Sequence, residues 1–252
     1  MNKRRLDAEL AARGLVTSRS QAESWIKLGK VTVDGKVVTK SGHSISDNSE
    51  IILTATEQYV SRAGLKLASV AQLLGVSFKG KTVLDVGSST GGFTDYALQH
   101  GAAKVFAVDV GTDQLHPSLH DHPLIELHEK TDIRDFVLSP EHRPDIVVID
   151  VSFISLREVL PHIARNLSTP TTQIVAMVKP QFEAGKYQTN KGIIKNDSLR
   201  RQILKEFEIW TKDLFVIQDK RDSEVAGSKG NRERFYLLTL NRNSTTSPGR
   251  IR

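Results

Sequence analysis

The sequence predicts an α/β protein whose main part is a mostly parallel β-sheet with helices on both faces, preceded by a small α+β domain. Three observations support this fold. After residue 62, short apolar segments alternate with helical segments, as in sheets built from strand–helix–strand units. A glycine-rich turn follows the first of these apolar segments. Residues 1–55 instead have the pattern of two short helices and a hairpin.

The composition is that of a globular protein with enough apolar residues for a core. The chain has 252 residues, of which 38% are hydrophobic and 25% charged, and it has no cysteine. The lack of cysteine excludes disulfides, thiolate metal sites and a catalytic thiol, and it fits a reducing compartment. There is no secretory signal at the start and no apolar segment of about 18 residues. We therefore expect a cytoplasmic protein without a membrane partner.

Positive charge is concentrated toward the two ends of the chain, and the net charge is +6. Residues 179–252 carry 16 basic and 9 acidic side chains, and residues 1–60 carry 9 and 7, whereas residues 61–178 carry 10 and 13. This distribution fits solvated surfaces, or a polyanion held from both ends of the chain.

The first domain is expected over residues 1–55. Leu6, Leu10 and Leu15 share one face of a helix that Gly14 ends, and Ser18 is a typical N-cap for a second helix. The expected elements are helices over 4–14 and 19–28, a strand–turn–strand over 30–38 with Asp34 and Gly35 at the turn, a strand over 51–54 and a linker over 56–61.

The second domain is expected over residues 62–242, followed by a disordered polar tail over 243–252. Its first helix offers Leu65, Leu67, Val70, Leu73 and Leu74 for packing. Seven apolar strands follow, and the last two have no obvious helix between them. The expected strands are 82–86, 104–109, 124–127, 145–150, 173–178, 213–219 and 235–240, and the expected helices are 92–100, 155–167 and 197–211.

A glycine-rich turn follows the first strand of this sheet, at residues 85–94. Gly87, Gly91 and Gly92 allow the backbone to approach a ligand at the carboxyl end of the strand. Asp85 precedes the turn, and Asp109 ends the next strand, where a carboxylate can bind ribose hydroxyls. The turn is neither Gly-x-Gly-x-x-Gly nor a P-loop, so dinucleotide and phosphate sites are disfavoured.

This segment resembles the first motif of Rossmann-like methyltransferases that use S-adenosylmethionine. The resemblance implies that the turn holds the methionine part and Asp109 the ribose, leaving S-adenosylhomocysteine as product. Residues after the third strand resemble the adenine-contacting segment, although Asp132 has an equally good interpretation as a turn-capping residue. The implied cofactor-binding residues are Asp85, Gly87, Ser88, Ser89, Gly91, Gly92, Phe93, Asp109, Asp132 and Ile133.

Two features that the sequence lacks reduce the number of possible methyl acceptors. Methylation of pyrimidine carbon-5 generally uses a cysteine thiolate, and the chain has none. Amino-group methylation of bases usually shows Asn/Asp-Pro-Pro-aromatic after the fourth strand, where this chain has Asp150-Val-Ser-Phe153. A hydroxyl acceptor remains, which needs a positioned base or a group that stabilises an alkoxide. Lys179, directly after the fifth strand, is a candidate, with a snorkelling surface lysine as the alternative.

Four separated segments resemble the TlyA family, whose members are often called haemolysins and act as ribosomal-RNA cytidine 2′-O-methyltransferases with an FtsJ-like domain. These segments are 61–66, 150–155, 178–183 and 230–235. The resemblance implies a catalytic tetrad of Lys66, Asp150, Lys179 and Glu233, with Glu224 as a rival for the last position. In this interpretation the two lysines depress each other's pKa, and Asp150 orients both.

Residues 3–54 resemble the S4 RNA-binding domain. The resemblance implies that Arg5, Arg19, Lys27 and Lys30 contact RNA phosphates, although each fits equally well as a solvated surface charge. Arg62 and the basic residues of 186–201 would extend this surface. The implied partner is ribosomal RNA within assembled subunits. Whether the chain forms oligomers stays open.

Two other function classes remain as alternatives: an inactive RNA- or ribosome-binding factor on the same fold, and, with less support, a membrane-active haemolysin. The cluster His116, His120, His122 and His128 lies in an irregular, proline-containing stretch without metal-site spacing. We therefore expect no metal.

Overall fold

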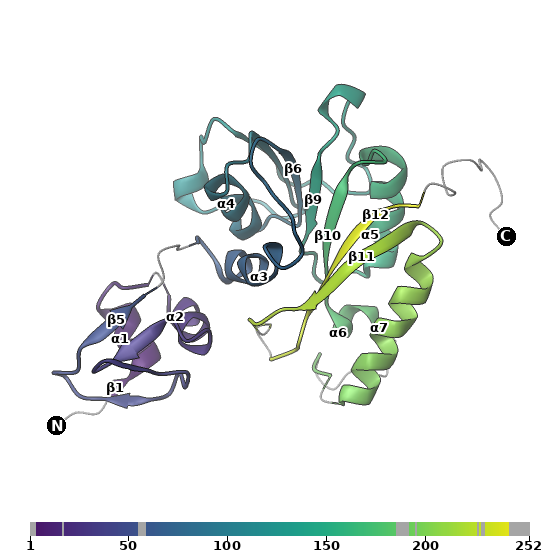
Figure 1. Ribbon diagram of the computed structural model, residues 1–252. Helices are drawn as coiled ribbons and strands as arrows, with labels where there is room; N and C mark the ends of the chain where they lie inside the picture. Colours follow the sequence, from purple (N-terminus) through teal and green to yellow (C-terminus); the bar gives the residue numbers. More distant parts are fainter. Residues whose placement is uncertain are drawn as a thin grey trace.

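The computed structural model describes residues 4–16, 18–54, 59–184, 192–194, 196–225, 227 and 230–241. Figure 1 shows a small N-terminal unit beside a larger unit built around one sheet. Residues 56–58 of the linker expected over 56–61, and all of the tail expected over 243–252, lie outside the described residues. No helix in the described part is long and apolar enough to cross a membrane.

The N-terminal unit contains the two predicted helices, and its hairpin turns where the sequence indicates. Asp34 and Gly35 have φ of 49° and 76°, the combination that joins two strands in a tight type I′ turn. Ser18 caps the second helix by accepting a hydrogen bond from the Gln21 amide. The elements are β1 (Arg4–Arg5), α1 (Leu6–Ala12), α2 (Arg19–Lys27), β2 (Val31–Val33), β3 (Lys36–Val37), β4 (Ser44–Ile45) and β5 (Ile51–Leu53).

The first predicted helix begins two residues too early. Arg4 and Arg5 are extended and pair with Ile45 and Ser44 in a two-stranded sheet. The sequence analysis missed β4, because two residues are too few to show an alternating pattern. This pairing places both arginines at the surface of the unit.

The large unit contains one seven-stranded sheet with the order β11-β12-β10-β9-β6-β7-β8. The first five strands along the chain are parallel, whereas β12 runs antiparallel to both β10 and β11, in agreement with the missing helix between the last two strands. The strands are β6 (Thr82–Val86), β7 (Lys104–Val108), β8 (Ile125–His128), β9 (Ile146–Ile149), β10 (Gln173–Val178), β11 (Phe215–Asp222) and β12 (Arg234–Leu240).

Helices cover both faces of this sheet, and alternate strand residues face the two layers. Val83, Val105 and Val148 pack with α3 and α4, whereas Leu84 and Val147 pack with α5 and α7. The helices are α3 (Arg62–Ala71), α4 (Gly92–Gln99), α5 (Leu156–His162), α6 (Pro180–Glu183) and α7 (Asp197–Thr211), with 3₁₀ turns at Pro117–Leu119 and Pro140–His142 and a π turn at Ile163–Leu167.

Two predicted details of the helices are wrong. Leu73 does not pack in the core and is 59% exposed, because α3 ends at Ala71 and the chain turns there. The helix expected over 155–167 stays α-helical only to His162 and continues as a π turn.

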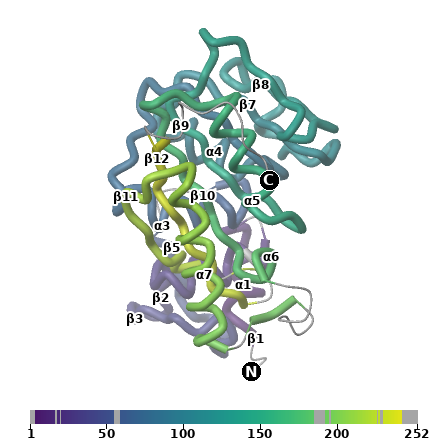
Figure 2. Tube along the Cα trace, turned by 90° about the vertical axis from the view of Figure 1, so that its right-hand side faces the viewer, coloured from purple at the N-terminus to yellow at the C-terminus, as the bar shows by residue number. Residues whose placement is uncertain are grey.

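The N-terminal unit lies toward the end of the sheet at which α6 follows β10, as both views show (Figures 1 and 2). The Gln21 side chain of α2 donates a buried hydrogen bond of 2.8 Å to the carbonyl of Tyr59, just before α3. The core of the N-terminal unit continues into the α3–α4 layer. The fold therefore places this unit next to the carboxyl ends of the central strands.

Candidate active site

The predicted site residues meet at the carboxyl ends of four neighbouring strands. Asp85 lies in β6, and Asp109, Asp150 and Lys179 directly follow β7, β9 and β10, which are adjacent in the order β10-β9-β6-β7. Ligands bind at this edge in open α/β sheets. Three cavities of about 370, 140 and 310 Å³ lie next to one another here. The first two share Gly87 and Asp150, and the last two share Lys179.

The glycine-rich turn has the left-handed backbone that its glycines allow. Gly87 has φ of 80°, and a Cβ there would lie 2.9 Å from the carbonyl oxygen of Asp150. Gly91 has φ of 86°, and a Cβ there would lie 2.5 Å from Leu119. Any side chain at these positions would therefore push the turn away from its neighbours.

Not every predicted glycine lines a cavity. Gly87, Ser88, Ser89 and Phe93 line the cavity of 140 Å³ together with Asp85, whereas Gly91 and Gly92 do not. A Cβ at Gly92 would lie 2.8 Å from the amide nitrogen of Gly64 in α3. Gly91 and Gly92 thus shape the turn and its helix rather than face a ligand.

Asp109 is held by backbone amides at the mouth of the largest of the three cavities. Its carboxylate accepts hydrogen bonds of 2.8 Å from the Ser89 amide and 2.7 Å from the Gly111 amide. The same carboxylate group borders the cavity of 370 Å³ with Asp132 and Ile133. A carboxylate in this position can bind the hydroxyls of a ribose.

Asp132 combines its two predicted roles. Its carboxylate accepts a hydrogen bond from the Arg134 amide and forms a 2.6 Å ion pair with the Arg134 guanidinium. Hydrogen bonds from Arg134 hold the pKa of Asp132 below its usual value. The residue therefore caps its turn as an anion while it lines the cavity.

Asp85 is a fully buried carboxyl group beside the glycine-rich turn. Thr94 donates a 2.7 Å hydrogen bond to Oδ2, whereas Oδ1 has no hydrogen-bond partner. Burial raises the pKa of Asp85 to about 7, since a charged group is disfavoured away from water. An unpaired buried oxygen next to a cavity is suited to bind a cationic group of a ligand.

The four tetrad residues form two ion pairs rather than one mutually oriented group. Lys179 Nζ lies 2.5 Å from Asp150 Oδ1, and Lys66 Nζ lies 2.6 Å from Glu233 Oε2. Asp150 therefore orients Lys179, while Glu233 holds Lys66. Both pairs are largely shielded from solvent, and both lysines line the cavity of 310 Å³.

The geometry separates the two candidate glutamates. Glu233 is 2% exposed and faces Lys66, whereas Glu224 is exposed. A Cβ at Gly227 would lie 2.7 Å from Glu233 Oε1, so a glycine there lets the chain close over this carboxylate. Only Glu233 is in a position to complete the group around Lys66.

Sequence reasoning missed Ser152, which borders all three cavities. Its hydroxyl accepts a 2.7 Å hydrogen bond from Lys179 Nζ. The signal was present, since Ser152 lies two residues after Asp150 in a segment that resembles a family motif.

Phe153 was missed for a different reason. It is 92% exposed and has φ of 67°, a conformation that bulky residues rarely adopt. Its ring lies 5.2 Å from the ring of Phe182, and both phenylalanines line the cavity of 310 Å³. No sequence pattern indicates a left-handed phenylalanine.

Glu183 connects the loops that carry these side chains. Its carboxylate accepts a hydrogen bond of 2.6 Å from the Ser155 hydroxyl and another of 2.8 Å from the Leu156 amide, at the start of α5. Burial raises the pKa of Glu183 above its usual value, although these hydrogen bonds oppose the shift. The segment 150–156 is thereby tied to the segment 179–183.

The predicted RNA-binding cations fall into two groups. Arg5 and Arg19 both form ion pairs with the buried carboxylate of Asp7, at 2.8 and 3.0 Å, while Lys27 and Lys30 are exposed. Arg62 opens α3 and lines the cavity of 310 Å³. Of the basic residues in 186–201, those at 186, 191 and 195 lie outside the described residues.

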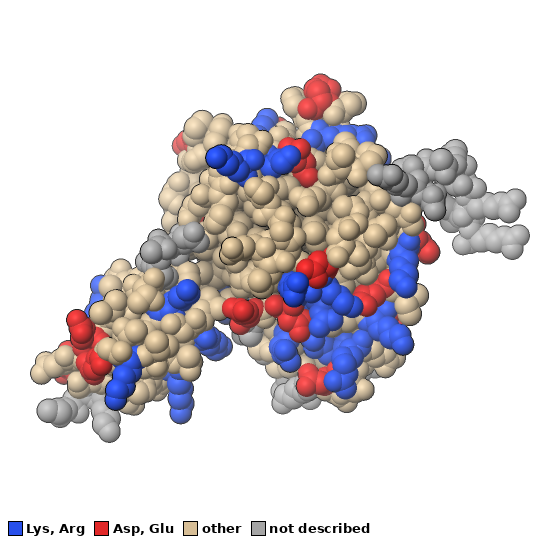
Figure 3. All heavy atoms as spheres, in the orientation of Figure 1, with Lys and Arg blue, Asp and Glu red and all other residues tan. Residues whose placement is uncertain are grey.

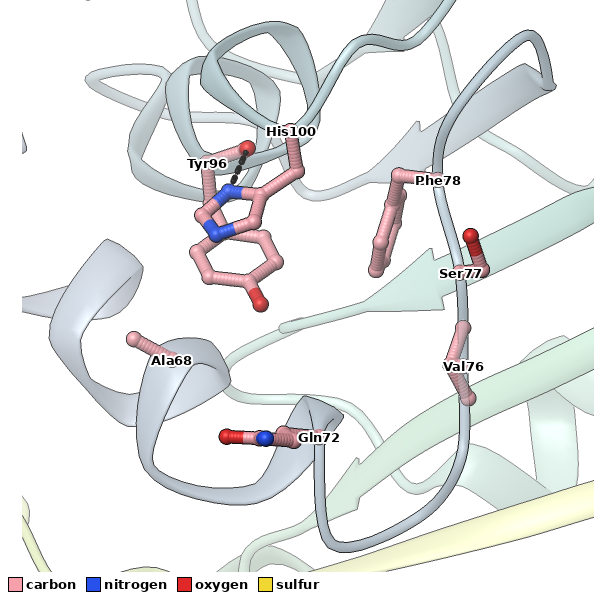
Figure 4. A pocket seen from close by; sticks show the side chains of 7 residues that line it. All are labelled: Ala68, Gln72, Val76, Ser77, Phe78, Tyr96 and His100. Carbon is pink, nitrogen blue, oxygen red and sulfur yellow. Dashed lines mark hydrogen bonds between the residues drawn. The ribbon is translucent and has the colours of Figure 1, made fainter.

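Two further features carry no function in our interpretation. The described residues contain no group of three or more His, Asp or Glu side chains arranged to hold a metal ion. Another cavity, of about 340 Å³, lies between the ends of α3 and α4 (Figure 4). There the His100 ring stacks on Tyr96, with ring centroids 3.9 Å apart. None of the predicted site residues lines it.

Comparison with known proteins gives consistent matches over nearly the whole chain. The model of the FtsJ-like methyltransferases matches residues 59–241, and that of the S4 domain matches residues 4–51. The chain is 42% identical to the "16S/23S rRNA (cytidine-2'-O)-methyltransferase TlyA" of Mycobacterium tuberculosis, covering 93% of this chain and 89% of that protein. It is 39% identical to "Hemolysin A" of Brachyspira hyodysenteriae, covering 91% and 97%.

A solved structure is similar over almost the same length. The structure "Putative hemolysin from Streptococcus thermophilus" is 36% identical, with a TM-score of 0.71, and the match covers 96% of this chain and 90% of that one.

Proposed function

The chain belongs to the FtsJ-like methyltransferase family, within the TlyA group that carries an N-terminal S4 domain. From this premise we propose that it methylates the 2′-hydroxyl of cytidine in ribosomal RNA. The observation that supports this most directly is the position of the Lys179–Asp150 pair. It lies between the cavities beside the glycine-rich turn and the cavity that contains Lys66 and Glu233.

The cavities on the glycine-rich side fit S-adenosylmethionine. Asp109 would bind the ribose hydroxyls, and Asp132 and Ile133 would border the adenine. The buried, unpaired Oδ1 of Asp85 fits the ammonium group of the methionine part. When bound, this cofactor supplies a methyl group on a positively charged sulfur.

The cavity on the other side fits the acceptor ribose. An ammonium group has three N–H donors. Lys179 donates one of them to the Ser152 hydroxyl and forms a close ion pair with Asp150, and a further N–H would contact the 2′-oxygen. Lys179 would pass one proton to the Asp150 carboxylate and take up the hydroxyl proton in its place, and its ammonium group would stabilise the negative charge on the 2′-oxygen that receives the methyl group.

Lys66 and Glu233 would line the opposite side of the acceptor. The Lys66 ammonium is fixed by the carboxylate, and it adds positive potential where negative charge develops on the 2′-oxygen. Correct placement of the hydroxyl against the methyl group supplies much of the rate. No step in this scheme uses a metal.

The aromatic pair of the exposed Phe153 and the half-buried Phe182 fits a nucleobase. Phe153 and Phe182 present ring surface at the acceptor cavity, and unpaired bases of RNA commonly stack on such rings. The N-terminal unit, with Lys27 and Lys30 exposed, would contact RNA phosphates further away. We propose assembled ribosomal subunits in the cytoplasm as the partner.

The test is methyl transfer to ribosomal subunits purified from cells that lack the corresponding methyltransferase. Labelled S-adenosylmethionine and mass analysis of the nucleosides would identify the product. We expect 2′-O-methylcytidine. A methyl group on a base, or no transfer to either subunit or to free ribosomal RNA, would show that the proposal is wrong.

A further inference from the structure

The segment 230–234 joins the acceptor cavity to a basic surface. Asn231 and Glu233 are buried and line the cavity. Arg232 and Arg234 do not line the cavity, and both form ion pairs with Asp222 at the end of β11. The side chains alternate between two sides, as expected for an extended segment. One short stretch therefore reaches both the acceptor and this basic surface.

Lysine and arginine side chains gather over α7 and β11 (Figure 3). We name this surface the α7–β11 patch. Its members come from α7, β11 and the segment 230–234, and are Arg200, Arg201, Lys205, Lys220, Arg221, Arg232 and Arg234. The carboxylates of the same elements and of the loop directly after β11 number six against these seven cations: Asp197, Glu206, Glu208, Asp219, Asp222 and Glu224.

Two carboxylates fix most of the patch in place. Asp222 lies 2.7 Å from Arg200, 2.6 Å from Arg234 and 3.7 Å from Arg232. Burial disfavours the charge on Asp222, but hydrogen bonds from Arg234 and Arg200 outweigh it and lower the pKa of Asp222. One anion thus holds three cations, one from α7 and two from the segment 230–234, and a surplus of positive charge remains.

The other carboxylate extends this network along α7. Glu208 pairs with Lys220 at 2.7 Å and with Arg234 at 4.0 Å. Arg200 also donates a 3.0 Å hydrogen bond to the carbonyl of Arg232, which ties α7 to the segment beside the acceptor cavity. These cations are held in position before any partner binds, which lowers the entropy cost of binding.

Arg201 and Lys205 are the members best placed to meet a partner. They lie four residues apart on α7 and therefore on one face, and both are exposed. Neither forms an ion pair with the residues that the structure describes. Their full charge is available outward.

We propose that the α7–β11 patch binds phosphates of the RNA strand that flanks the acceptor nucleotide. The inference rests on the proposed function for the identity of the polymer. The patch is continuous with the acceptor cavity, and this favours RNA as the partner. When one nucleotide of an RNA strand occupies the cavity, the adjacent nucleotides must pass over the rim of the cavity. Arginine forks also match phosphate geometry. The patch would bind the RNA strand on one side of the acceptor nucleotide, and the N-terminal unit would bind the strand on the other side.

The experiment compares two double variants of the full chain. Arg201→Glu with Lys205→Glu reverses the outward charge of the patch. Lys79→Glu with Arg165→Glu makes the same change in net charge at two exposed side chains that precede β6 and β10, at the amino ends of the strands. Binding to protein-free ribosomal RNA is measured by filter retention over a series of salt concentrations, beside S-adenosylmethionine affinity and thermal melting.

We expect the patch variant to bind RNA about tenfold more weakly. Its slope of log affinity against log salt should fall by about 1.4, since each phosphate contact contributes ~0.7 for a single strand. The control variant should stay near wild type, and Arg201→Lys with Lys205→Arg should retain binding. Cofactor affinity and melting should not change in any of them.

Equal losses in the patch and control variants would show that only net charge matters, and the proposal would be wrong. Unchanged RNA binding by the patch variant would also overturn it, as would patch-dependent binding to anionic lipid vesicles without RNA binding. The measurement does not require methyl transfer. A protein that binds RNA through the patch but transfers no methyl group would therefore contradict the proposed function alone.

Discussion

Lys66 and Glu233 form an ion pair of 2.6 Å between the first helix of the large unit and its last strand region. Both side chains are nearly enclosed, at 9% and 3% exposed. The pair thus joins α3, which follows the N-terminal unit, to the segment that carries Arg232 and Arg234. It lies where the acceptor cavity meets the segment that leads to the α7–β11 patch.

Removing one partner of this pair should destabilise the fold. Glu233→Ala leaves a buried ammonium without its carboxylate, and we expect a loss of about 3–5 kcal/mol in the free energy of unfolding. The double variant Lys66→Met with Glu233→Leu should recover most of this loss yet remain inactive. Urea unfolding and methyl transfer measure the two effects. Glu224→Ala is the matched control and should change neither.

Lys179→Ala should abolish transfer without loss of the cofactor. We expect a rate reduction of about 10²–10⁴-fold, the usual contribution of a positioned acid–base group, with S-adenosylmethionine affinity within about threefold of wild type. Ser152→Ala should show a smaller reduction, because Asp150 still holds the lysine. Isothermal titration and single-turnover assays separate binding from transfer. Full activity of Lys179→Ala would rule out the proposed role.

The family resemblance implies the tetrad and a single Asp150 that orients both lysines, whereas in the structure Asp150 pairs with Lys179 and Glu233 pairs with Lys66. The positions of Asp150 and Lys179 directly after apolar segments predict that both lie at the carboxyl ends of strands, and the adjacency of β9 and β10 in the sheet brings them together. The pairing of Lys66 with Glu233 depends on α3 and the extended segment at 230–234 meeting on one side of the sheet, which no local pattern specifies.

Short and strained elements are the parts that sequence patterns miss. The two-residue strands β1 and β4 pair with each other over a long separation, and tertiary contact overrides the helical pattern of Arg4 and Arg5. Phe153 adopts a positive φ that its residue type disfavours. Such departures from local preference are expected at functional sites.

Glu183 is expected to act as a positioning residue. It ties Ser155 and Leu156 to α6, and so fixes Phe153 and Lys179 relative to each other. Glu183→Ala should lower kcat and raise KM for RNA, because both the base and the hydroxyl lose their placement. Glu183→Gln, which keeps an acceptor for the Leu156 amide, should recover most of kcat. A purely structural role predicts instead that both variants lose stability with unchanged kinetics of the folded fraction.

The pKa of Asp85 makes stability depend on pH in a predictable direction. Its pKa is about 7 in the folded protein and 3.8 without burial, so the folded state holds its proton more tightly. Stability from this group is present below about pH 4 and is lost as pH rises to about 7. The loss is at most about 4 kcal/mol, at 1.36 kcal/mol per unit. Asp85→Asn should remove this component.

Comparison of urea unfolding for wild type and Asp85→Asn at pH 5, 6, 7 and 8 measures that component, since the other titrating groups are common to both. We expect the difference in unfolding free energy to grow in favour of the variant up to about pH 7 and then to level off. The ionised Asp85 should bind the cofactor's ammonium, so wild-type affinity for S-adenosylmethionine should rise over the same interval while that of the variant stays flat. A constant difference in stability would mean that Asp85 does not titrate there.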